Sequence, residues 1–207
     1  MSRINTEYHT EYREDAKKKI IAAALDVATE HGWNSVTLDA IARHVGVTKP
    51  ALYSYFKNRE ALLREVTLEV AWSIRTGLET TLAHDDDIPG IIRNLAELFF
   101  ERQKTFASIF FLLPTRRPHY PAYRQEFIRI FDDCRILIRD CLARIKTKGK
   151  MSRIVNPDTA TYMIIAMTMG LLGSSDFLEM DVSASKKIWI EAMQRLLLIG
   201  PGVECSG

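Results

Sequence analysis

Apolar residues recur along this chain at spacings of three and four residues, which is the repeat of an amphipathic α-helix. The repeat begins with Ile20, Ala24 and Val27 and returns in segments up to the C-terminal part of the chain. No stretch alternates apolar and polar residues with the period of two that is typical of a strand. The pattern therefore predicts an all-α protein of about nine helices.

Capping residues and glycines predict the limits of the helices in the first part of the chain. Residues 1–12 lack the helical repeat and are expected to form a mobile arm. The first helix is predicted from about Glu14 to Gly32, because glycine is a common helix stop. Side-chain oxygens that can accept hydrogen bonds from free N–H groups mark the starts of the next helices, and they belong to Thr37, Thr48 and Asn58.

Further helices are predicted in the remainder of the chain. The helix that starts at Asn58 should end near Leu82. The later helix starts are marked by Asp, Asn, Ser, Thr or Pro, which are favoured before or at the first positions of a helix. These starts are Asp87, Thr105, Pro121, Asn156, and either Asp181 or Ser183.

Residues 37–63, TLDAIARHVGVTKPALYSYFKNREALL, have the features of a helix-turn-helix followed by a third helix. This motif needs a small residue where its helices cross, a residue that tolerates positive φ at the turn, and apolar anchors on either side. Ala42, Gly46 and the pair Val45 and Val47 supply them in the required order. The second helix of the motif would present its first residues to the major groove of DNA. We therefore expect an N-terminal arm and DNA-binding domain in residues 1–60 and a second domain in residues 61–207.

The run from Ile20 to Leu63 resembles the DNA-binding domain of the TetR family of transcriptional regulators. The resemblance rests on its AA…G…T…IA…GV…LY.YF…E.L pattern, in which many residues stand at fixed spacing. The rest of the chain matches that family only in the number and length of its helices. The resemblance thus implies an N-terminal three-helix DNA-binding domain and a C-terminal helical domain for ligand binding and dimerisation.

The resemblance also assigns roles to single residues. Lys49, Pro50 and Ala51 would read bases at the start of the recognition helix, where Lys49 could donate to guanine O6 or N7 and its neighbours could touch a thymine methyl. The other expected DNA contacts, mainly to phosphates, are Thr37, Arg43, Thr48, Tyr53, Tyr55, Lys57 and Arg59. The alternative for the aromatic residues is packing, which we expect for Phe56 and not for Tyr55.

In the TetR family, the last two long helices of each subunit form a four-helix interface. A dimer would hold two DNA-binding modules about 34–36 Å apart, the separation that reads two half-sites of a palindromic operator. The residues expected at such an interface here are Met163, Ala166, Gly170, Gly173, Trp189, Ala192, Met193 and Leu196. The alternative is that these helix faces pack against the core of their own subunit.

Aromatic side chains are concentrated on the helices that the resemblance places around a ligand cavity. Apolar walls with few polar groups are typical of such cavities, so the set favours a hydrophobic or aromatic small-molecule effector. For any single aromatic residue, packing in the core is the stronger alternative. The predicted pocket residues are Trp72, Phe99, Arg102, Phe106, Phe110, Tyr123, Phe127, Phe131, Met163 and Met167.

Charge, cysteines and hydropathy restrict the remaining possibilities. The formal net charge of +2 argues neither for nor against nucleic acid as a partner. Cys134, Cys141 and Cys205 match neither a zinc spacing nor a disulfide framework, which favours a reduced intracellular protein. No apolar run reaches the roughly 20 residues of a membrane-spanning helix. We expect a soluble, cytoplasmic protein with no membrane partner, no cofactor and no bound metal.

These patterns favour a DNA-binding transcriptional regulator over an enzyme. The chain has no GxGxxG, Walker or HExxH motif and no nucleophile elbow. The resemblance implies a repressor that binds double-stranded DNA as a homodimer and is released by its effector. The alternative is a DNA-bound regulator that is controlled by a protein partner and has no small-molecule ligand.

Overall fold

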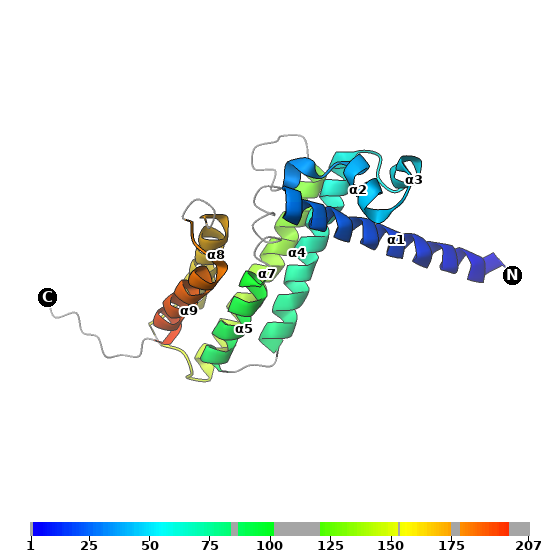
Figure 1. Ribbon diagram of the computed structural model, residues 1–207. Helices are drawn as coiled ribbons and strands as arrows, with labels where there is room; N and C mark the ends of the chain where they lie inside the picture. The colour runs from blue at the N-terminus through cyan, green and yellow to red at the C-terminus, as the bar shows by residue number, and fades with distance from the viewer. Residues whose placement is uncertain (1, 84–86, 102–120, 153, 175–178, 199–207) are drawn as a thin grey trace. The chain divides into compact units, whose positions relative to one another are not determined.

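The structure is a computed structural model that describes residues 2–83, 87–101, 121–152, 154–174 and 179–198. Within these ranges all regular secondary structure is helical, which confirms the predicted all-α fold (Figure 1). The helix predicted after Thr105 lies outside the described residues. The helices are α1 (Ser2–His31), the short 3-10 helix η1 (Trp33–Ser35), α2 (Leu38–Val45), α3 (Lys49–Tyr53), α4 (Arg59–Ala83), α5 (Ile88–Phe100), α7 (Pro121–Thr147), α8 (Pro157–Ser174) and α9 (Val182–Leu198).

The chain divides into two compact units, Met1–Val70 and Ala71–Gly207, which we call the N-terminal unit and the C-terminal unit. The division lies inside α4, so this helix contributes residues to both units. The domains predicted from the sequence, residues 1–60 and 61–207, divide the chain at the start of the same helix.

Local capping sets the helix boundaries of the N-terminal unit. The Thr37 hydroxyl accepts a hydrogen bond of 3.1 Å from the Ala40 N–H, and the Thr48 hydroxyl accepts one of 3.4 Å from the Ala51 N–H. Gly46 ends α2 with φ at 76°, a left-handed conformation that is costly for residues with a Cβ atom. The predicted caps and the predicted turn between α2 and α3 are therefore confirmed.

The predicted mobile arm is wrong for the described residues 2–12, because α1 begins at Ser2 (Figure 1). This stretch has no apolar stripe, but it also has no glycine or proline before Gly32. Glu, Lys and Arg are good helix formers, and each residue added to an existing helix gains a backbone hydrogen bond. The repeat of apolar residues shows where a helix packs, and a helix can continue beyond that region.

The core of the N-terminal unit is an apolar cluster to which α1, α2, α3 and α4 all contribute. Ala24, Ile41, Leu52 and Leu62 are all fully buried in it. Phe56 is 2% exposed in the same cluster, which agrees with its predicted packing role. Burial of one such side chain contributes roughly 1.5–3 kcal/mol, so this cluster is sufficient to hold the short α3 in place.

In the C-terminal unit, α5 packs against α9, α7 packs against α8, and α8 packs against α9. The sequence left two candidates for the cap of α9, Asp181 and Ser183. In the structure the cap is Asp181, whose Oδ1 accepts a hydrogen bond of 2.7 Å from the Ala184 N–H. Asp87 and Asn156 cap α5 and α8 in the same way. None of the helices in the described ranges is long and apolar enough to cross a membrane.

Trp189 of α9 lies at the centre of this helical packing and is fully buried. Its ring meets Phe99 and Phe100 edge-on, with centroid separations of 6.0 and 6.2 Å. Its indole Nε1–H donates a hydrogen bond of 2.8 Å to the hydroxyl of Thr168 on α8. One side chain thus joins α5, α8 and α9.

An ion pair between Glu97 of α5 and Lys186 of α9, 2.5 Å from Oε1 to Nζ, also joins two of these helices. The hydrogen bond from Lys186 is the main reason why the pKa of Glu97 lies below its ordinary value. A lowered pKa means that the pair stabilises the fold above the ordinary glutamate pKa of about 4.3. This stabilisation is lost as the pH falls through the lower pKa of the folded chain.

We therefore expect Glu97→Gln to flatten the acid side of the stability profile. The variant should melt at a lower temperature than the wild type at pH 7, and the difference should be smaller at about pH 3, below the ordinary glutamate pKa. The difference in melting temperature at pH 7 should be small because the side chains of Glu97 and Lys186 are both partly exposed. Thermal melting followed by circular dichroism across this pH range measures it. Glu191→Gln, at an exposed position of α9, is the control, and an equal gap for Glu97→Gln at both pH values would contradict the prediction.

Candidate nucleic-acid interface and apolar pocket

The residues predicted to contact DNA surround α3 and the turn before it. All of them are exposed except Tyr55 and Arg59, which are half-buried. Lys49, Pro50 and Ala51 form the first turn of α3, where the Thr48 cap leaves their side chains facing solvent. Tyr53, at the end of the helix, is 51% exposed. The structure therefore presents a continuous set of donors and small apolar groups at the start of α3.

Lys49 forms an ion pair with Asp39, in the first turn of α2. Both side chains are substantially exposed, at 60% and 47%. Exposed ion pairs contribute little stability, typically about 0.2–1 kcal/mol. The ammonium group can therefore leave Asp39 for another acceptor at small cost.

Arg59 was predicted to contact phosphate, and the structure gives it an internal role. Its Nε donates to the backbone oxygen of Val36 and its Nη2 donates to that of Trp33, both at 2.6 Å. These carbonyls belong to the connection between α1 and α2, where the Trp33 oxygen also accepts from the Val36 N–H at 3.3 Å. Arg59 therefore fixes the segment that leads into α2 and the Thr37 cap.

Arg13 of α1 supports the end of α3, a role that the sequence did not indicate. Its Nη2 donates to the Ser54 backbone oxygen at 3.1 Å, and its guanidinium lies 5.7 Å from the centroid of the Tyr55 ring. Lys17, one turn further along α1, pairs with Glu65 of α4 at 2.7 Å. No signal in the sequence could have linked residues 41 positions apart, because these contacts exist only after α1 packs on the other helices.

An open depression beside α2 brings Thr37 and Arg43 together with residues that were not predicted. His31 and His44 lie at its edge, each at the C-terminal end of a helix. Each faces a carboxylate, with 3.6 Å from His31 to Glu30 and 3.9 Å from His44 to Asp26. The only sequence signal was their position in a last helical turn, where the dipole of the helix favours a cation.

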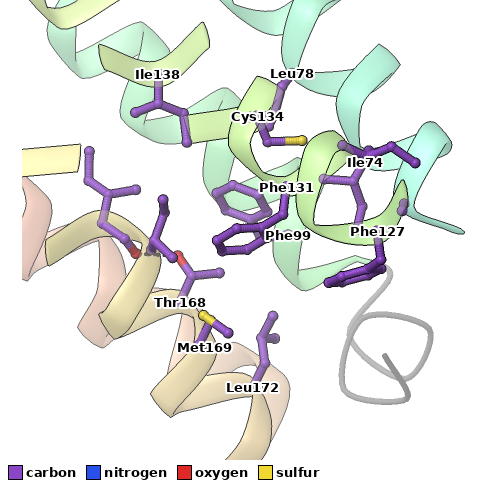
Figure 2. A pocket seen from close by; sticks show the side chains of 14 residues that line it. Ile74, Leu78, Phe99, Phe127, Phe131, Cys134, Ile138, Thr168, Met169 and Leu172 are labelled. Atoms are coloured by element: carbon purple, nitrogen blue, oxygen red, sulfur yellow. Dashed lines mark hydrogen bonds between the residues drawn. The ribbon is translucent and has the colours of Figure 1, made fainter. Parts of the chain in front are cut away.

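The C-terminal unit contains an apolar pocket of about 100 Å³ among α4, α5, α7 and α8 (Figure 2). Three predicted residues line it, Phe99, Phe127 and Phe131, and the last two rings are stacked with centroids 6.4 Å apart. The described residues that line it are Ala71, Ile74, Leu78, Phe99, Phe127, Ile130, Phe131, Cys134, Ile138, Ile164, Ile165, Thr168, Met169 and Leu172.

Three predicted pocket residues do not line this pocket. Trp72 is 37% exposed and has the Arg75 guanidinium 5.4 Å from its ring centroid. Met163 is 46% exposed and Met167 is half-buried on a neighbouring face of α8. Successive residues of a helix are rotated by about 100°, so the pocket is lined by the adjacent Ile164 and Thr168 instead. The remaining predictions, Arg102, Phe106, Phe110 and the side chain of Tyr123, lie outside the described residues.

Cys134 is a pocket residue that the sequence analysis did not select. Burial raises the pKa of its thiol to about 12, so the group is a neutral thiol near neutral pH. Among the described residues there is no group of three or more His, Cys, Asp or Glu side chains that could hold a metal ion. The described lining of the pocket is therefore apolar in its chemistry.

The residues predicted for a dimer interface divide into two sets. Trp189 and Met193 are 0% and 1% exposed within the single chain, so these two predictions are wrong and the alternative, packing in the chain's own core, holds for them. Ala192 and Leu196 are half-buried. The remaining residues lie on one exposed face of α8, and they are Met163, Ala166, Gly170 and Gly173.

Residues 20–66, which include the α2–turn–α3 segment, match the family model described as bacterial regulatory proteins, tetR family. The chain is 32% identical over 92 residues to the uncharacterized HTH-type transcriptional regulator YdeS of Bacillus subtilis, a match of 44% of this chain and 46% of YdeS. It is 46% identical over 44 residues to the class A tetracycline repressor protein from transposon 1721 of Escherichia coli, a match of 21% of this chain and 20% of the repressor. The chain thus spans less than half the length of these curated relatives.

The fold is also similar to a solved structure, that of the transcriptional regulator FadR from Bacillus subtilis in complex with stearoyl-CoA. The TM-score is 0.66 at 19% identity, over 85% of this chain and 96% of that protein. This likeness extends beyond the DNA-binding segment, and at such low identity it concerns the fold alone.

Proposed function

Because the chain belongs, through residues 20–66, to the TetR family of bacterial regulatory proteins, we propose that it is a DNA-binding transcriptional regulator. The observation that carries the proposal is the exposed first turn of α3, where Lys49, Pro50 and Ala51 face solvent beside the Thr48 cap. A recognition helix enters the major groove with its N-terminal residues first. Lys49 would then donate to guanine, and Ala51 or Pro50 would contact a thymine methyl.

The regulator acts as a homodimer on a palindromic operator. The exposed stripe of Ala166, Gly170 and Gly173 on α8 supports this part of the proposal, because small residues allow two helices to approach closely. A two-fold dimer would place the recognition helices on half-sites about one DNA turn, or about 34–36 Å, apart.

The apolar pocket would hold a hydrophobic effector that releases the protein from DNA, so that it acts as a repressor. Support comes from the class A tetracycline repressor among its relatives and from the stearoyl-CoA bound by a protein of the same fold. Arg59 at the start of α4 holds the segment before α2, and Ile74 and Leu78 of the same helix line the pocket. A ligand that favours one tilt of α4 would change DNA affinity. Control by a protein partner in place of a small molecule is the second candidate.

Selection of binding sites from random DNA by the full-length protein, followed by fluorescence anisotropy, tests the proposal. We expect a palindromic site, and we expect Lys49→Ala to lose about 1–3 kcal/mol of discrimination at one base pair of each half-site. Lys57→Ala is the control, since loss of an exposed cation should weaken binding to all sequences alike. Recovery of no preferred site would refute the proposal, and equal losses on specific and random DNA for Lys49→Ala would refute the base-reading role.

Asp39 competes with DNA for Lys49. Asp39→Asn should therefore raise affinity for DNA by about 0.2–1 kcal/mol, the usual strength of an exposed ion pair. The gain should be much smaller when the same change is made in a Lys49→Ala background, which is a double-mutant cycle. Anisotropy titrations of the four proteins at one salt concentration measure the coupling, and an equal gain in both backgrounds would assign the effect to net charge alone.

A further inference from the structure

We propose that the apolar pocket takes a hydrocarbon moiety that carries no hydrogen-bond acceptor, such as one aromatic ring or a short alkyl chain. The polar part of the effector would remain outside the pocket. The inference rests on the proposed function of this pocket as the effector site, and it specifies the chemistry of the part that enters.

The described residues of the pocket wall have almost no proton to donate to a ligand. Among them, Thr168 and Cys134 are the two whose side chains carry a polar hydrogen. The Thr168 hydroxyl donates its hydrogen to the Ile164 backbone oxygen at 2.7 Å, and it also accepts the 2.8 Å bond from Trp189. Cys134 offers a thiol, which is a weak donor. A ligand carbonyl, ether or carboxylate in this pocket would therefore lose its hydrogen bonds to water without replacement.

The backbone of these described lining residues offers no donor either. The lining residues lie beyond the first turn of α4, α5, α7 and α8. Only the first four N–H groups of a helix lack a partner within the helix. The N–H groups of the pocket wall are therefore used in helical hydrogen bonds, and contacts with a ligand must come from carbon and sulfur atoms.

The size and shape of the pocket fit a single ring or a short chain. An engineered apolar cavity of about 150 Å³ binds benzene, and this pocket, with about 100 Å³, can enclose no more than one ring or a short chain. Phe99, Phe127 and Phe131 lie on one side of it, and Thr168 and Leu172 lie on the other (Figure 2). Phe131 is 39% exposed, so the pocket wall reaches solvent at this ring, and a polar substituent would leave the pocket there.

Ethylbenzene and anisole provide a matched pair of probes, because they have the same number of heavy atoms and anisole replaces one carbon with an acceptor oxygen. Titration of each into the full-length protein, followed by NMR of isoleucine and methionine methyl groups, gives the two Kd values. We expect ethylbenzene to bind at least about tenfold more tightly than anisole. Equal Kd values, or no binding of ethylbenzene up to its solubility limit, would overturn the inference.

Two leucine substitutions show whether binding occurs in this pocket. Ala71 lines the pocket and is 5% exposed, so Ala71→Leu should fill it and abolish ethylbenzene binding. Ala83→Leu adds the same side chain at an exposed position of the same helix and should leave the Kd unchanged. A thermal melt establishes that both variants are folded, and unchanged binding by a folded Ala71→Leu would overturn the assignment to this pocket.

The experiment is separate from the test of DNA binding, since neither titration contains DNA. If the protein selects an operator and ethylbenzene does not bind, the inference fails and the proposed regulator remains. If ethylbenzene binds as expected and no operator is selected, the proposed regulator fails while the chemistry of the pocket is upheld.

Discussion

Replacement of Trp189 by alanine should lower the free energy of unfolding by about 3–5 kcal/mol. The side chain is fully buried, contacts two phenylalanine rings and donates to Thr168. Alanine would leave a cavity between α5, α8 and α9 and would remove the donor from a buried oxygen. A loss of this size is a large part of the 5–15 kcal/mol that stabilises a typical domain.

Urea unfolding followed by circular dichroism measures the effect, and two further variants separate its causes. Trp189→Phe keeps most of the volume and removes the hydrogen bond, so it should cost less, about 1–3 kcal/mol. Glu191→Ala changes an exposed residue of the same helix and should remain within about 0.5 kcal/mol of the wild type. A loss below about 1 kcal/mol for Trp189→Ala would show that the helices can close the cavity.

Arg59→Ala should both destabilise the N-terminal unit and weaken binding to every DNA sequence. Hydrogen bonds to a charged group are worth about 1.5–3 kcal/mol each, and Arg59 makes two, to Val36 and Trp33. Because the group is only partly buried, we expect a combined loss of roughly 2–4 kcal/mol. The segment before α2 would then move, and with it the Thr37 cap.

Hydrogen exchange shows where the Arg59→Ala substitution loosens the N-terminal unit. Amide protection should fall in residues 33–45 in the Arg59→Ala variant, whereas Lys57→Ala should leave protection unchanged and weaken only DNA binding. Arg59→Lys keeps the charge but cannot donate in two fixed directions, so it should resemble the alanine variant in exchange. Wild-type protection in Arg59→Ala, together with weaker DNA binding, would return this residue to a direct phosphate contact.

The parts of the fold that depend on local interactions could be predicted from the sequence. Thr37, Thr48 and Asn58 cap the predicted helices, because a capping side chain and its N–H partner are only three residues apart. The left-handed turn at Gly46 is equally local. The exposed start of α3 follows directly from these elements, so most of the candidate interface was predictable.

Features that depend on packing between distant segments could not be predicted. Arg59 stands at a helix N-terminus, where a phosphate contact is plausible from sequence, and only the fold brings it to carbonyls more than 20 residues away. Helix α8 has apolar residues on more than one face, so periodicity did not decide whether Met163 or Ile164 faces the pocket. Trp189 was assigned to an interface for the same reason, because an apolar helix face does not specify its partner.

The hydrogen bond from the Thr168 hydroxyl to the Ile164 backbone oxygen also bears on the heat that binding should release. A buried water needs two to four polar partners, and the described residues of the pocket wall leave it few, since the Thr168 hydrogen is already donated to Ile164. A ligand that enters would therefore release little ordered water, and its main gain would be dispersion contacts with the aromatic walls. Binding of this kind is driven by enthalpy at 25 °C, so titration calorimetry with ethylbenzene should be exothermic, with only a small contribution from entropy.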